Sequence, residues 1–152
     1  MLKLYSVLIV ALFGLTACSE SDENRVIEKP TSRTVHMQSI AGLSWYSHID
    51  NALESAQKSH KNLIVMVGEA SCRWCKKMKE RTLTDEKVKE KMSEYILVSV
   101  KRSDKAEVAH VPEFDGSIPS FFFMKDNEEV YDSVIGYFKA DDFLRYMNEI
   151  EE

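Results

Sequence analysis

The sequence predicts an α/β domain in which a mixed sheet carries helices on both faces. Three features support this: continuous apolar runs typical of buried strands, amphipathic stretches between them, and a late pair of apolar segments around a polar turn. The chain has 152 residues, 44% of them hydrophobic, which suits one globular domain with a substantial core. Its formal net charge of −5 argues against nucleic acid as a partner.

The first predicted helix covers residues 47–60, where apolar positions recur at helical spacing. Its buried face is expected to carry Ile49, Leu53, Ala56 and His60. Ser47 and Asp50 have the spacing of a capping box at its start. The run LIVMV, residues 63–67, then reads as a strand buried on both faces.

Two helices and a second buried strand follow, which together with the first strand make a parallel βαβ unit. The helices are predicted over about 72–82 and from Thr84 onward, and the strand over 95–100. SFFFM (120–124) and VYDSVI (130–135) then flank a polar turn and predict an antiparallel hairpin. A last helix is expected to bury Phe143, Leu144, Met147 and Ile150.

The N-terminal residues indicate export and a lipid anchor. The apolar run LYSVLIVALFGL is too short to cross a bilayer comfortably but fits the core of a signal peptide. LTACSES resembles the lipobox of bacterial lipoproteins, which implies a signal peptide over 1–17 and lipidation of Cys18; an ordinary secretory signal is the alternative. We expect a flexible tether over 18–40 and the folded domain over 41–152. Ser19 after the cysteine favours the outer membrane of a bacterial cell envelope.

Cys72 and Cys75 form a C-x-x-C motif where the first buried strand meets the next helix. A helix N-terminus favours a thiolate, so Cys72 is the candidate nucleophile. Arg73, Lys76 and Lys77 add positive charge there, although the lysines could equally form a solvated helix face. Cys75, one turn on, is expected to be more buried and less ionised, which suits a resolving thiol.

Other uses of the cysteine pair fit less well. A c-type haem needs His directly after the second cysteine, where Lys76 stands. A zinc site needs two more ligands, and the four histidines are not paired at ligand spacing. A static crosslink over so small a loop would stabilise little. We therefore favour a redox couple, with no metal and no cofactor beyond the Cys72–Cys75 disulfide.

These segments together resemble the thioredoxin-like superfamily, in particular extracytoplasmic proteins similar to the C-terminal domain of the Dsb-type transmembrane thiol carrier. CRWCKKM matches the C-x-x-C-K-x-M pattern of that domain, SIPSFFFM its cis-proline segment, and VIGYFKADDFL the glycine-aromatic turn before its last helix. The resemblance implies a thioredoxin-like fold with a mixed four- to five-stranded sheet and helices on both faces. It also implies that Pro119 is a cis-proline whose loop lies against the disulfide.

The resemblance suggests further site residues. Ile118 and Pro119 would offer backbone to a bound substrate strand, and Arg73 and Trp74 would contact substrate. The alternative for Trp74 is packing on the domain surface, whereas Trp45 is expected in the core.

One departure from the family concerns proton transfer. Cytosolic thioredoxins carry a buried aspartate six residues before the first cysteine, and here that position is Met66. Glu69 is a candidate proton acceptor for Cys75, with an exposed loop acid as the alternative interpretation.

We therefore expect a monomeric, membrane-tethered thiol:disulfide oxidoreductase that acts on protein thiols and disulfides. Ile118 before the proline resembles reducing thioredoxins, which favours a reductase recharged by a transmembrane thiol electron donor. The alternatives are a disulfide oxidase or isomerase, a copper- or metal-binding lipoprotein that uses both thiolates as ligands, and a binding module in which the thiols play no part.

Overall fold

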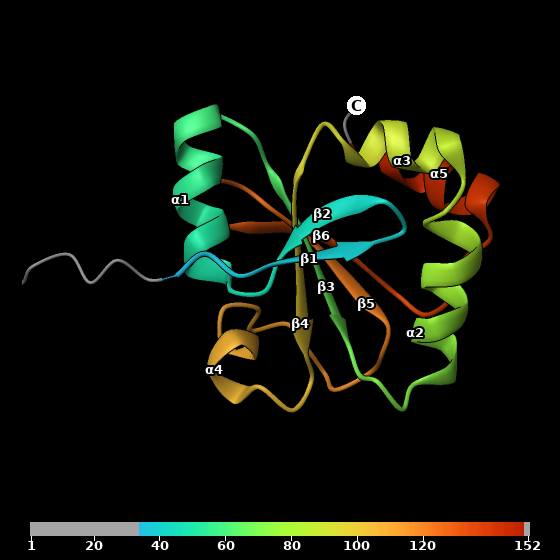
Figure 1. Ribbon diagram of the computed structural model, residues 1–152, viewed down its shortest axis with the longest axis horizontal. Helices are drawn as coiled ribbons and strands as arrows, with labels where there is room; N and C mark the ends of the chain where they lie inside the picture. Colours follow the sequence, from blue (N-terminus) through green and yellow to red (C-terminus); the bar gives the residue numbers. More distant parts are fainter. Residues whose placement is uncertain (1–33, 151–152) are drawn as a thin grey trace, which may run out of the picture. The chain divides into compact units, whose positions relative to one another are not determined.

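The computed structural model describes residues 34–150, which form one mixed sheet covered by helices on both faces (Figure 1). The predicted signal peptide, the predicted lipidation site Cys18 and most of the predicted tether lie outside these residues. Within 34–150 no helix combines the length and the apolar character that a membrane crossing requires.

The sheet has six strands in the order β1-β2-β4-β3-β5-β6. In chain order they are β1 (Met37–Ile40), β2 (Leu43–Tyr46), β3 (Leu63–Gly68), β4 (Ile96–Lys101), β5 (Ser120–Met124) and β6 (Val130–Ile135). β4 runs parallel to β2 and β3, whereas β5 is antiparallel to both β3 and β6. All six residues of β3 are buried, as the continuous apolar run predicted.

The helices divide between the two faces of the sheet. They are α1 (Ile49–Ser59), α2 (Arg73–Lys77), the π-helical turn η1 (Met78–Thr82), α3 (Glu86–Met92), α4 (Lys105–Val108) and α5 (Ala140–Glu149). α1 and α4 lie on one side in Figure 1, and α2, α3 and α5 on the other. Because side chains alternate along a strand, Val65 packs toward α1 while Met66 packs toward the opposite helices.

The sheet has more strands than the four to five predicted. Residues 37–40, which the sequence assigned to the tether, pair with β2 as an edge hairpin, so the predicted tether end at residue 40 is wrong. Each strand has only four residues and most of them are not buried, so neither shows a buried apolar run in the sequence. Trp45 of β2 is fully buried, as predicted, and its indole N–H donates to the Ile40 carbonyl at 3.2 Å.

The predicted capping box of α1 is also wrong. The N-cap is His48, which makes no side-chain cap hydrogen bond. Glu107 of α4 accepts the Ile49 N–H at 2.7 Å instead, and its other oxygen lies 2.7 Å from Nδ1 of His48. His60 is exposed in a left-handed conformation that ends the helix, so it is not part of the buried face.

Candidate active site

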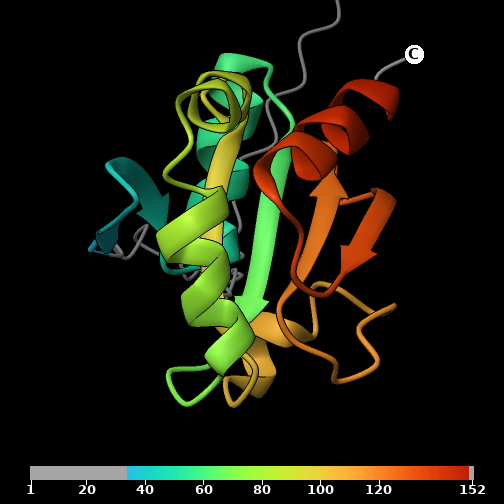
Figure 2. The same ribbon diagram turned by 90° about the vertical axis from the view of Figure 1, so that its right-hand side faces the viewer.

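The two cysteines of the motif form a disulfide at the end of β3. Cys72 is the N-cap of α2, and its sulfur accepts a hydrogen bond from the Cys75 N–H at 3.0 Å. Figure 2 shows α2 beginning beside the C-terminal end of β3, near the loop that leads into β5. Cys72 is half-buried, whereas Cys75 is only 2% exposed. A substrate sulfur therefore reaches the Cys72 sulfur more easily than that of Cys75. The N–H groups at the start of α2 can stabilise a thiolate at Cys72.

A loop distant in sequence lies against this disulfide. The Ile118–Pro119 bond is cis, as the resemblance implied, and Pro119 is buried. The Ile118 carbonyl oxygen lies 3.9 Å from the Cys72 sulfur, across a separation of 46 residues. A disulfide sulfur carries no proton, so this is a contact in the oxidised protein; a reduced Cys72 thiol could donate to that oxygen. Gly136 N–H donates to the Pro119 carbonyl at 2.8 Å and fixes the loop to β6.

An aromatic and cationic cluster borders the cysteines. The Trp74 ring is 45% exposed and stacks on Tyr137, with centroids 5.6 Å apart. Lys77 Nζ lies 4.9 Å from the Trp74 centroid and 4.3 Å from that of Tyr137, and the Arg73 guanidinium lies 5.1 Å from Trp74. Trp74 therefore packs on the domain, while nearly half of its surface stays open to solvent.

The open face of Trp74 contributes to a small hollow. Trp74, Ile118, Gly136 and Tyr137 line about 250 Å³ of space. Thus Trp74 and Ile118, predicted from sequence to bind substrate, lie on one surface. Tyr137 was not singled out from the sequence, although it belongs to the glycine-aromatic turn that carried the resemblance.

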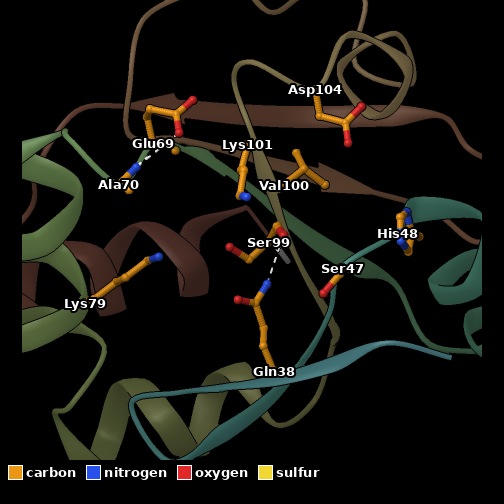
Figure 3. A pocket seen from close by; sticks show the side chains of 11 residues that line it. Gln38, Ser47, His48, Glu69, Ala70, Lys79, Ser99, Val100, Lys101 and Asp104 are labelled. Atoms are coloured by element: carbon orange, nitrogen blue, oxygen red, sulfur yellow. Dashed lines mark hydrogen bonds between the residues drawn. The ribbon is translucent and has the colours of Figure 1, made fainter.

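Glu69 lies in the loop between β3 and α2. Its carboxylate accepts the Ala70 N–H at 3.2 Å and the Ser103 N–H at 3.3 Å (Figure 3 shows the first). Hydrogen bonding, chiefly with Ser103, lowers the pKa of the Glu69 carboxyl from its ordinary value. A carboxylate stabilised in this way is a weak proton acceptor for a thiol, which argues against the predicted role of Glu69.

Metal ligation was one of the alternatives. Across residues 34–150 there is no group of three or more His, Cys, Asp or Glu side chains that could hold a metal ion.

Comparison with known proteins agrees with this geometry. The family model Thioredox_DsbH, described as "Protein of unknown function, DUF255", matches residues 23–131. Spermatogenesis-associated protein 20 of Homo sapiens is 30% identical over 70 residues, which is 45% of this chain. The chain spans only 9% of the length of that relative.

Solved structures share the fold. The C-terminal domain of Neisseria meningitidis DsbD in the oxidised form has a TM-score of 0.57 at 20% identity, covering 66% of this chain and 91% of that chain. A structure titled "DsbH Oxidoreductase" has a TM-score of 0.57 at 15% identity, covering 71% and 83%. A Thermus thermophilus thioredoxin has a TM-score of 0.58 at 20% identity, covering 68% and 84%.

These findings confirm the predicted thioredoxin-like fold. Together with the disulfide of the C-x-x-C motif, they support the predicted enzyme class, a thiol–disulfide oxidoreductase. By its matching family model, which covers most of the sequence, the chain belongs to the Thioredox_DsbH (DUF255) family of the thioredoxin-like superfamily.

Proposed function

We propose that this protein is a lipid-anchored thiol:disulfide oxidoreductase of the bacterial cell envelope that reduces disulfides of protein substrates. The observation that carries the proposal is the asymmetric cysteine pair. The half-buried Cys72 sulfur lies at a helix N-terminus, beside the Ile118 carbonyl and the hollow under Trp74, while Cys75 is shielded behind it.

The reaction takes two exchange steps. The Cys72 thiolate attacks one sulfur of the substrate disulfide, so that a mixed disulfide forms and one substrate thiolate leaves. Cys75, as a thiolate, then attacks the Cys72 sulfur and releases the second substrate thiolate. Two electrons pass to the substrate, and the Cys72–Cys75 pair becomes the disulfide seen here. The Ile118–Pro119 backbone would align the substrate strand, and Arg73 and Trp74 would contact it.

The direction and the location rest on sequence features. Ile118 before the proline resembles reducing thioredoxins, and the lipobox-like residues up to Cys18 support export and anchoring. A fold shared with the DsbD C-terminal domain and with a DsbH oxidoreductase is consistent with an extracytoplasmic role. A reductase there needs reducing equivalents, which a transmembrane thiol donor would supply. No further cofactor is required, because the dithiol itself carries the electrons.

The reduction potential of the pair tests the direction. We expect a value near that of thioredoxin, about −270 mV, in full-chain protein purified in detergent and equilibrated with dithiothreitol or glutathione buffers. Fluorescence of Trp74 next to the disulfide, or mass spectrometry after alkylation, reports the oxidised fraction. A value near about −120 mV would identify an oxidase instead. A reduced pair that binds Cu(I) and never forms the disulfide would favour the metal-binding alternative.

The anchor is tested separately at Cys18. Cys18→Ser is expected to move most of the protein from the membrane fraction to the soluble fraction, because the thioether-linked lipid can no longer form. Cell fractionation with immunoblotting measures the shift, and Cys72→Ser serves as a control that should stay with the membrane. Retention of Cys18→Ser in the membrane would contradict lipidation at this residue.

A further inference from the structure

The second exchange step leaves one proton without an obvious acceptor. Cys75 must lose its thiol proton before it attacks Cys72, yet it is 2% exposed, and burial disfavours the charged thiolate. On the neighbouring strand β3, Met66 offers no acidic or basic group. Glu69 is held as a carboxylate by Ala70 and Ser103.

Cys75 lines a partly open pocket whose lining also includes a different titratable group. The cavity measures about 240 Å³ and is lined by Glu69, Ala70, Cys75, Lys76, Lys79 and Glu80. A larger pocket of about 420 Å³ shares Glu69, Ala70 and Lys79 with it. Figure 3 shows Lys79 reaching from the helix into this pocket, its amino end directed toward Ser99 of β4. Space of this size and polarity admits a water that relays a proton between groups not in direct contact.

Lys79 differs from the other lysine of the same cavity. Lys76 is 72% exposed and lies 3.8 Å from the Glu80 carboxylate. Lys79 is half-buried, and within residues 34–150 no carboxylate or other hydrogen-bond partner holds its amine. Burial lowers the pKa of the Lys79 amine from its ordinary value, which favours the uncharged amine relative to an exposed lysine. It stands four residues after Cys75, in the π-helical turn η1 that directly follows α2, and both residues line the same pocket.

We propose that Lys79 exchanges a proton with the Cys75 thiol through the shared cavity during release of the reduced substrate. The inference rests on the proposed function and adds a residue to it. The neutral Lys79 amine takes the proton of Cys75, and the Cys75 thiolate attacks the Cys72 sulfur. The Cys72–substrate bond breaks, its electron pair leaves on the substrate sulfur, and the Lys79 ammonium returns its proton to solvent or to that sulfur.

Other charged groups face the same space and set the background for a pH profile. Those in the small cavity are Glu69, Lys76 and Glu80; those in the larger pocket are His48, Glu69, Lys101 and Asp104. A change that is specific to Lys79 must therefore be separated from a general change in charge. Lys89 of α3 provides a matched control, because its side chain is likewise largely covered, 26% exposed, and lines neither space.

The experiment compares Lys79→Met, Lys79→Arg and Lys89→Met in the full chain, in detergent. Reduced protein reacts with glutathione disulfide, and acid quenching with mass spectrometry separates mixed-disulfide formation from its resolution. We expect Lys79→Met to slow the resolution step about tenfold or more while the first step keeps its rate. Lys79→Arg should slow it as well, because an arginine side chain does not give up its proton. The pH at which resolution is fastest should rise in both Lys79 variants.

A second measurement does not depend on turnover. In a Cys72→Ser background, thiolate absorbance gives the pKa of Cys75. Lys79→Met is expected to raise that pKa by about one unit, because the ammonium that forms when Lys79 takes the proton no longer stabilises the thiolate. Lys79→Arg keeps a positive charge and should leave the Cys75 pKa near the parent value. If Lys79→Met fails to fold, Lys79→Arg replaces it in the rate measurement, where it is expected to slow resolution. If Lys79→Met resolves the mixed disulfide within twofold of the rate of Lys89→Met, and the two variants share the same Cys75 pKa, the role of Lys79 is overturned. A parent protein that never forms a mixed disulfide would overturn the proposed function instead.

Discussion

Cys72→Ser is expected to lower disulfide reduction by at least about a thousandfold, because the attacking sulfur is gone. Cys75→Ser is expected to stop the reaction one step later. In this variant Cys72 can still attack a substrate disulfide, but the buried residue 75 no longer supplies the thiolate for the second exchange. The mixed disulfide then persists. Both variants therefore lose turnover, but they differ in what accumulates. Cys75→Ser should accumulate the mixed disulfide with substrate, and Cys72→Ser should not.

Non-reducing electrophoresis and mass spectrometry of envelope fractions distinguish the two products. Cys75→Ser should accumulate covalent adducts that disappear with dithiothreitol, and their masses would identify the substrates. The double variant Cys72→Ser, Cys75→Ser is the control and should form none. Adducts that form on Cys72→Ser as readily as on Cys75→Ser would show that Cys75 is the entry point, contrary to the exposure of the two residues.

The parts of the fold that the sequence predicted are those with a local signal. β3, β4 and β5 are covered on both faces, so they carry long apolar runs, interrupted in β4 only by Ser99. The edge hairpin of β1 and β2 has no such run, and the one-turn helix α4 is too short to show a period. The start of α1 is capped by Glu107, which lies 58 residues away in sequence from Ile49. A local capping pattern near residue 49 therefore could not predict this contact.

The same distinction applies to the site. The C-x-x-C motif and Pro119 are visible because each stands in a short, specific pattern. The roles of Tyr137 and Lys79 depend on what lies beside them: Tyr137 matters because Trp74 stacks on it, and Lys79 because it shares a cavity with Cys75. A lysine next to Met78 in a basic helix reads from sequence as one more solvated cation. Only the folded chain distinguishes it from Lys76 and Lys77.

Phe143→Ala is expected to give the largest loss of stability, about 3–5 kcal/mol, because it leaves a cavity where a fully buried ring packs. The Phe143 ring lies 5.0 Å from that of Phe121 and 6.3 Å from that of Phe138, measured between centroids. Such a loss is a large share of the about 5–15 kcal/mol that stabilises a typical domain. Urea denaturation followed by circular dichroism measures it, with the half-buried neighbour Leu144→Ala as the control that should lose less.

Phe143 also connects the two loops of the site, so its loss should affect more than stability. Phe121 follows Pro119 by two residues, and Phe138 adjoins Tyr137, the residue that holds Trp74. The Phe138 carbonyl further accepts a hydrogen bond from Thr82 at the end of η1, which continues the helix of the cysteines. The Phe143 ring therefore joins the cis-proline strand to the segment of Tyr137 and Phe138, and the Thr82 hydrogen bond joins that segment to the helix of the cysteines. We expect Phe143→Ala to expose Trp74 and red-shift its emission at urea concentrations where the parent is folded. Equal losses of stability in Phe143→Ala and Leu144→Ala, with unchanged emission, would show that the loops hold their positions without this ring.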